Sequence, residues 1–197
     1  MKEGDVLVHE AGGNCVVTSQ TFEAKANQRV FSNNGNSSLG YALPAAIGAC
    51  ITTQKPVICI TGDGGLNFNI QEFQTIKHYN LPVKVLIFNN QAFGITKAYR
   101  DTNFQSNYAG VDAEHGMSSP DFKKVATAYG LKSLYIHDHN ELRENIKYVL
   151  EVNEPIICDI NMAGFYDYNP KLGWNSPIED QYPFLPRDEF RENMIIE

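Results

Sequence analysis

The sequence predicts an α/β fold: a doubly wound, mostly parallel sheet with helices on both faces. Two observations predict the sheet. Short apolar runs alternate with helical patterns along the chain, and the runs are almost continuously apolar. Strands buried on both faces have this texture, and strand–helix alternation is typical of parallel sheets. We expect one domain over residues 1–161 and an extended tail over residues 162–197 packed on it.

The expected strands are short, apolar and mostly rich in β-branched residues, and they cover residues 6–9, 56–61, 83–88, 134–136 and 155–160. A helix rich in Ala and Leu is expected over residues 39–52. Asn69, with Glu72 three residues later, predicts a capped helix start. Pro120 suits the first position of a further helix, and an apolar stripe over residues 142–150 marks another. From Met162 onward prolines interleave with aromatic residues, which indicates the tail.

Composition excludes several classes of protein. With 43% hydrophobic and 20% charged residues, the 197-residue chain is expected to fold around a core. The net charge of −7 and the lack of a basic cluster argue against nucleic acid as a partner. No apolar run approaches the roughly 20 residues that span a bilayer, so no membrane role is expected. Four cysteines without a CxxC pair, and a start without an apolar signal region, predict reduced thiols and a cytoplasmic location.

Two expected strands end in unusual residues. One end reads Thr61-Gly62-Asp63-Gly64-Gly65, and the other reads Asn89-Asn90-Gln91-Ala92-Phe93-Gly94. The 24 residues from 65 to 88 hold one helix and one strand, so the two ends can lie side by side. In parallel sheets of this kind, ligands bind beyond the carboxyl ends of the strands.

These residue types suit a metal-bound diphosphate. Asp63 offers a carboxylate and Asn90 an amide oxygen, which are the hard ligands that Mg²⁺ prefers. Glycines let backbone N–H groups approach a phosphate, and a helix starting near Asn69 would add a positive dipole end. Either motif alone is more simply a turn or a loop start. Their combination at two strand ends favours the functional interpretation.

GDG followed after 24 residues by NN resembles the signature of thiamine-diphosphate-dependent enzymes. Three further segments, residues 39–49, 80–90 and 119–122, resemble the acetolactate synthase family in particular, within a likeness that runs from about Gly4 to about Asn161. The chain is therefore similar to that family's C-terminal, diphosphate-binding domain.

The resemblance implies a role for each motif residue. Asp63, Asn90 and the carbonyl of Ala92 would ligate Mg²⁺. Leu39, as an apolar wedge under the bent cofactor, and Ile95, beside the thiazolium ring and substrate, would be the residues closest to catalysis. Without the resemblance, ordinary core is the simpler interpretation of both. The cofactor-binding set implied for thiamine diphosphate comprises Asn14, Ser37, Leu39, Gly62, Asp63, Gly64, Gly65, Asn90, Ala92, Gly94 and Ile95.

The chain departs from the family's pattern in three places. After the first strand it has Gly12-Gly13-Asn14-Cys15 where the family usually has Gly-Gln-His-Gln. Residues 33–38 are more polar than usual. The tail is unlike the ending of biosynthetic acetolactate synthases. The first two departures bear on substrate identity more than on cofactor binding.

The implied activity is decarboxylation of a 2-oxo acid and transfer of the acyl carbanion equivalent to a carbonyl acceptor. The family's activating glutamate belongs to a pyrimidine-binding domain of the same or a partner subunit. We therefore expect a homo-oligomer, and an isolated chain without turnover. Two alternatives stay open: a 2-oxo acid decarboxylase domain, and a non-catalytic nucleotide-binding module on the same fold.

Overall fold

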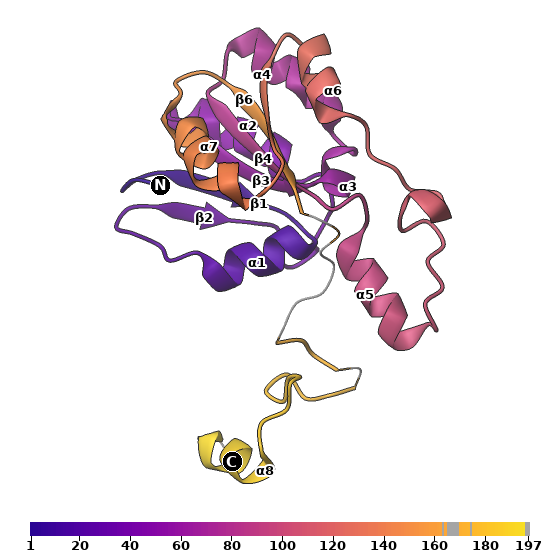
Figure 1. Ribbon diagram of the computed structural model, residues 1–197. Helices are drawn as coiled ribbons and strands as arrows, with labels where there is room; N and C mark the ends of the chain where they lie inside the picture. The colour runs from indigo at the N-terminus through magenta and orange to yellow at the C-terminus, as the bar shows by residue number, and fades with distance from the viewer. Residues whose placement is uncertain (163, 165–169, 174, 196–197) are drawn as a thin grey trace.

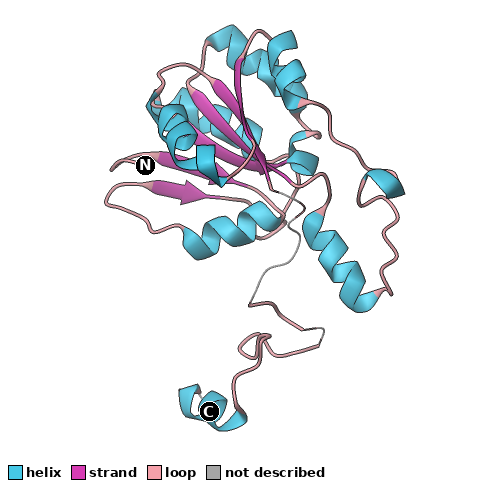
Figure 2. Cartoon of the chain, viewed as in Figure 1, coloured by secondary structure: helices cyan, strands magenta, loops and turns pink. Residues whose placement is uncertain are grey.

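A six-stranded, entirely parallel sheet forms the centre of the computed structural model, which describes residues 1–162, 164, 170–173 and 175–195 (Figures 1 and 2). The strand order is β2-β1-β3-β4-β6-β5. This confirms the α/β fold class and the doubly wound arrangement. The strands are β1 Val6–His9, β2 Arg29–Phe31, β3 Val57–Gly62, β4 Val83–Asn89, β5 Lys132–Ile136 and β6 Ile156–Asn161.

Helices cover both faces of the sheet. On one face α2 (Ala42–Thr53), α4 (Phe73–Tyr79) and α6 (Phe122–Ala128) pack on alternate residues of the strands, such as Val57 and Cys59. The other face presents Ile58 and Ile60, on which α7 (His139–Glu151) packs together with Phe22 at the end of α1 (Gly13–Thr21). Because successive strand residues point to opposite faces, apolar runs are needed to fill both layers. The remaining helices are α3 Asp63–Leu66, η1 Ile70–Glu72, α5 Gly94–Asn103, η2 Ala113–His115 and α8 Arg187–Asn193.

The register brings the two motif-bearing strands side by side. β3 pairs with β4 from Val57↔Val83 to Gly62↔Phe88, so both strands end at the same edge. β1 lies on the other side of β3, with His9 opposite Ile60. Three strand ends, those of β1, β3 and β4, therefore meet at one edge of the sheet.

Several local expectations were wrong. The segment from Leu39 to Tyr41 is not helical, because α2 begins at Ala42, and Pro44 lies in its first turn without breaking it. Asn69 does not cap a helix through its side chain, since its Nδ2 atom donates to the carbonyl oxygen of Gly40 at 2.7 Å. The helix nearest the GDG turn is α3, which begins at Asp63 itself.

The helix expected from Pro120 starts slightly later. α6 begins at Phe122, and Asp121 is its N-cap, accepting a hydrogen bond from the backbone nitrogen of Lys124 at 3.0 Å. Strand β2 and helix α1 were not expected at all. β2 has only three residues at the sheet edge, too few for a pattern of alternation.

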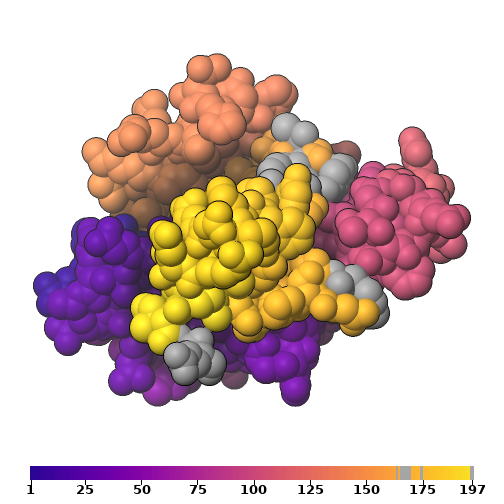
Figure 3. All heavy atoms as spheres, turned by 90° about the horizontal axis from the view of Figure 1, so that it is seen from below, coloured from indigo at the N-terminus to yellow at the C-terminus, as the bar shows by residue number. Residues whose placement is uncertain are grey.

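The tail has contacts of its own. Lys171 pairs with Tyr182 in an antiparallel bridge, and Arg187 forms an ion pair of 2.8 Å with Asp180. Its described residues, in yellow in Figure 3, are exposed or partly exposed, and none is buried. Packing of the tail on the domain stays a prediction. Within the part of the chain that the structure describes, no helix is long and apolar enough to cross a membrane.

Candidate functional site

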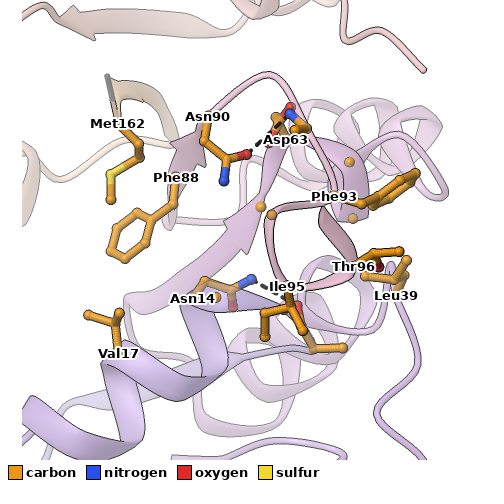
Figure 4. Close-up of a pocket in the computed structure, with 18 of the residues that line it drawn as sticks. Asn14, Val17, Leu39, Asp63, Phe88, Asn90, Phe93, Ile95, Thr96 and Met162 are labelled. Carbon is orange, nitrogen blue, oxygen red and sulfur yellow. Dashed lines mark hydrogen bonds between the residues drawn. The ribbon is translucent and has the colours of Figure 1, made fainter. Parts of the chain in front are cut away.

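A cavity of about 360 Å³ opens where β1, β3 and β4 end (Figure 4). All eleven residues that the sequence singled out line this cavity, although they come from four separate segments of the chain. Eight further lining residues were not among them: Ala11, Gly12, Gly13, Val17, Phe88, Phe93, Thr96 and Met162. The cavity therefore brings the predicted residues together, and the structure adds eight residues to its lining.

Asp63 is the buried acid of the cavity. It follows β3 directly and is 1% exposed. Its Oδ2 atom accepts a hydrogen bond of 2.8 Å from the hydroxyl of Ser119. Burial raises the pKa of the Asp63 carboxyl, and the hydrogen bond from Ser119 opposes that rise. None of the ion pairs between described residues involves Asp63. A buried carboxylate of this kind is stabilised by a cation.

Asn90 supplies a neutral oxygen beside that acid. It follows the last residue of β4, and its backbone N–H is close enough to Asp63 to lower the pKa of the carboxyl. Its side-chain oxygen accepts a hydrogen bond from the nitrogen of Ala92 at 3.2 Å. In Figure 4 the side chains of Asp63 and Asn90 lie at the same end of the cavity. The pair offers two hard oxygen ligands at adjacent strand ends.

The glycines of the cavity are required for different reasons. Gly12, at φ +105°, has a backbone conformation that other residues rarely adopt. A Cβ at Gly64 would lie 2.5 Å from the ring of Phe93, and one at Gly65 would lie 2.1 Å from Oε1 of Glu10. Gly13, by contrast, has open space where a Cβ would stand. Packing of protein atoms alone therefore explains Gly64 and Gly65, whatever contact they make with a phosphate.

Asn14 is engaged within its own turn. It is 5% exposed, its Nδ2 atom donates to the carbonyl oxygen of Ala11 at 2.9 Å, and its Oδ1 atom accepts from the nitrogen of Glu10. The side chain shapes the turn between β1 and α1. The first residues of α1 line the cavity, and a helix N-terminus favours an anion.

Apolar side chains form the other walls. In Figure 4, Leu39, Phe93, Ile95 and Thr96 lie on one side of the cavity, while Val17, Phe88 and Met162 lie on the other. Leu39 is 37% exposed, which is high for a large apolar residue beside a cavity. Ser37 also lines the cavity, with φ +49°. These walls leave room for an organic group beside the polar end formed by Asp63 and Asn90.

The donor set fits a metal-bound diphosphate. Asp63 brings a negative charge without a cationic partner among the described ion pairs, and Asn90 brings an oxygen beside it. The glycine turns add N–H groups that can approach phosphate oxygens. No group of three or more His, Cys, Asp or Glu with metal-binding geometry occurs among the described residues, so a metal here would take oxygen ligands from few side chains and from the phosphates.

Comparison with known proteins agrees with this site. A family model described as "Thiamine pyrophosphate enzyme, C-terminal TPP binding domain" matches residues 10–160. A "Probable acetolactate synthase large subunit" of Methanocaldococcus jannaschii is 34% identical over 158 residues, covering 79% of this chain and 26% of the relative. A protein of the same name from Methanococcus aeolicus is 31% identical over 160 residues, covering 81% of this chain and 26% of the relative.

A fungal relative extends the match. The "Acetolactate synthase catalytic subunit, mitochondrial" of Aspergillus candidus is 25% identical over 189 residues, which is 95% of this chain and 27% of the relative. A match of that extent includes residues of the tail. The chain thus spans about a quarter of the length of the curated relatives it matches. It belongs to the thiamine pyrophosphate enzyme family, as a C-terminal thiamine-diphosphate-binding domain of the acetolactate synthase type.

Proposed function

We propose that this domain holds thiamine diphosphate through Mg²⁺ and serves an enzyme that decarboxylates a 2-oxo acid and transfers the acyl carbanion equivalent to a carbonyl acceptor. One observation carries the proposal: the buried carboxylate of Asp63, which takes part in no ion pair between described residues, lies beside Asn90 at the glycine-lined end of a cavity. When bound, thiamine diphosphate supplies the carbon nucleophile and the electron sink for decarboxylation. The chain's residues would bind, orient and shield it.

Each residue has a proposed task. Asp63, Asn90 and the carbonyl of Ala92 would hold Mg²⁺, while backbone N–H groups at Gly62, Gly64, Gly65 and Gly94 and the turn at Asn14 would receive the diphosphate. Leu39 would support the bound cofactor as the apolar wedge. The carbonyl near Ser37 orients the amino group of the aminopyrimidine, and Ile95 borders the thiazolium ring and the substrate. The apolar walls exclude water from the reacting carbon.

Cofactor binding is tested by calorimetry of this chain with thiamine diphosphate and Mg²⁺, against ATP and Mg²⁺. Binding of thiamine diphosphate that requires Mg²⁺ supports the proposal, whereas preference for ATP supports the nucleotide-binding module. Asp63→Ala should abolish Mg²⁺-dependent binding and leave the fold intact, because it removes the acid of the metal site. Asp159→Asn is the matched control, since Asp159 is a buried acid on β6 that does not line the cavity. Unchanged affinity in Asp63→Ala contradicts the metal assignment.

The reaction is tested with a pyrimidine-binding domain present, supplied by the same or a partner subunit in a homo-oligomer. Pyruvate and an acceptor are added, and the carboligated product is separated from free aldehyde. A carboligated product supports transfer to an acceptor, while free aldehyde alone supports the decarboxylase alternative. The identities of the 2-oxo acid and the acceptor are not part of the proposal, and a cytoplasmic location stays a prediction.

A further inference from the structure

Another buried acid, Glu10, immediately precedes the cavity-lining residues Ala11 and Gly12 and has no role in the site described so far. It follows the last residue of β1 and is 0% exposed. Its Oε1 atom accepts a hydrogen bond from the hydroxyl of Thr61, and its Oε2 atom accepts one from the backbone nitrogen of Ala42 at 3.0 Å. Glu10 takes part in no ion pair between described residues.

The partners of Glu10 belong to two different parts of the cavity. Thr61 is 1% exposed and immediately precedes the turn of Gly62 and Asp63. Ala42 is the first residue of α2 and follows the segment that carries Leu39. Burial raises the pKa of the Glu10 carboxyl, and the nearby backbone N–H groups of Gly40 and Gly62 oppose that rise. One carboxylate thus joins the segment of the apolar wedge to the turn that bears the metal ligand.

The space around Glu10 shows how closely it is fitted. A Cβ on Gly65 would lie 2.1 Å from Oε1 and 3.0 Å from Cδ of Glu10. The glycine at position 65 therefore leaves room for the acid. Asn69 also holds the segment that carries Leu39, because its Nδ2 atom donates to the oxygen of Gly40 at 2.7 Å. A Cβ on Gly40, at φ +80°, would lie 2.7 Å from Cβ of Phe68, so the turn of the segment needs glycine there.

A buried acid is a costly way to fill space. Burying a carboxyl group is unfavourable unless hydrogen bonds compensate it, and an apolar residue of similar volume would fill the core more simply. What the carboxylate provides is two oxygens that accept hydrogen bonds from two chain segments at once. Its contacts with residues 32 and 51 positions away make it a link between those segments.

We propose that Glu10 is a positioning residue that fixes the Leu39 wedge relative to the diphosphate-binding turn at residues 62–65. The proposal rests on the proposed function for the identity of the bound group, and on the hydrogen bonds of Glu10 for the link itself. Glu10 acts through Ala42 on the wedge segment and through Thr61 on the turn, and it touches neither cofactor nor substrate.

The link is tested by amide hydrogen exchange of the ¹⁵N-labelled chain, followed by NMR, without any ligand. Glu10→Leu keeps much of the volume and removes both acceptors, so exchange at Gly40 and Ala42 should accelerate about tenfold or more. Glu10→Gln keeps the length and one acceptor for Ala42, and should restore most of the protection. Lys84→Met is the matched control, because Lys84 is a buried charged residue of β4 that does not line the cavity. This substitution should not selectively accelerate amide exchange at Gly40 and Ala42.

The coupling is tested by repeating the measurement with thiamine diphosphate and Mg²⁺. In the wild type, protection should increase at Gly64 and Gly65 and also at Gly40 and Ala42. In Glu10→Leu the increase at Gly64 and Gly65 should persist, while the increase at Gly40 and Ala42 is lost. If Glu10→Leu does not fold, Thr61→Val serves instead: it removes the hydroxyl that joins Glu10 to the turn and leaves the acceptor of Ala42, so the ligand-induced protection of Ala42 should fall.

The outcomes separate the two proposals. The link is overturned if the amide exchange rates of Gly40 and Ala42 are equal in wild type and Glu10→Leu. It is also overturned if these rates increase no more than those of the other core amides. Unchanged ligand-induced protection of Ala42 in Thr61→Val overturns it as well. If no ligand protects Gly64 and Gly65 in the wild type, the proposed function fails, and the ligand-free comparison still decides whether Glu10 joins the two segments.

Discussion

The hydroxyl of Ser119 donates a hydrogen bond of 2.8 Å to Oδ2 of Asp63, across 56 positions of sequence. Ser119 comes just before α6, whereas Asp63 follows β3. The bond engages Oδ2 of the carboxylate and not its other oxygen. A side chain that itself does not line the cavity thus orients the acid that does.

Ser119→Ala should weaken Mg²⁺-dependent binding of thiamine diphosphate by about tenfold, because loss of an outer partner of a metal ligand typically costs 10–100-fold in affinity. Ser118→Ala provides the control, since Ser118 is the exposed neighbouring serine. Calorimetric titration of both variants at saturating Mg²⁺ measures the difference. Equal affinities would mean that Asp63 keeps its orientation without Ser119.

Leu39→Ala should lower kcat more than it weakens cofactor binding. The bend of the cofactor that Leu39 is proposed to support matters more for the reaction than for anchoring the diphosphate. A displaced reacting geometry can cost on the order of 100-fold in rate. The measurement is kcat in an active assembly with a pyrimidine-binding domain, beside the Kd for thiamine diphosphate. Ile51→Ala, at an exposed apolar position near the end of α2, is the control. Unaffected turnover would make Leu39 an ordinary packing residue.

The isolated chain should show no turnover of 2-oxo acids and should bind thiamine diphosphate weakly. Its proposed anchors serve the diphosphate end, and the apolar side chain of Leu39 beside the cavity is 37% exposed. Exposed apolar surface of this kind favours association between copies. Carbon dioxide release from pyruvate, with cofactor and Mg²⁺ in excess, tests activity, and sedimentation tests association. Sustained turnover by the 197-residue chain would refute the idea of a half-site.

Lys84 predicts a pH dependence of stability. It is 1% exposed on β4, and its Nζ atom donates to the carbonyl oxygens of Val152 and Glu154, the latter at 2.5 Å. Burial lowers the pKa of Lys84 from 10.5 to about 8. Between those two values the unfolded chain binds more protons than the folded chain, so the free energy of unfolding rises with pH.

Relative to Lys84→Met, the wild type should therefore gain stability between pH 8 and pH 10.5, by on the order of 2 kcal/mol. The comparison with the variant removes the contribution of the other groups that titrate in this range. Urea unfolding at several pH values measures it. A constant difference between the two proteins would show that Lys84 keeps its ordinary pKa when buried.

The residues of the candidate site were easier to predict from the sequence than the elements that position them. Gly62, Asp63 and Asn90 could be predicted to lie together because their motifs stand at the ends of two strands. The parallel register of β3 and β4 brings these strand ends side by side. Glu10 was missed because an acid after a strand is ordinarily solvated, and its burial depends on Thr61 and Ala42, far away in sequence.

Two further misses have local causes. Helix α1 is short and begins with glycine, and its Val16-Val17-Thr18 is β-branched, so its own pattern does not favour a helix. Asn69 was interpreted as a cap because Asn followed by Glu72 fits that motif, but its amide instead hydrogen-bonds Gly40, an interaction between residues 29 positions apart. Tertiary contacts decided both cases.

The strand order also constrains how this molecule is made. Among the described strands, β5 (Lys132–Ile136) pairs only with β6, which follows it in the chain about 20 residues later. Until β6 leaves the ribosome, β4 has an unpaired edge and β5 has no place in the sheet. Bare strand edges template pairing between chains. A nascent or truncated chain that stops before residue 156 would therefore already hold the metal-binding motifs and yet be prone to aggregate.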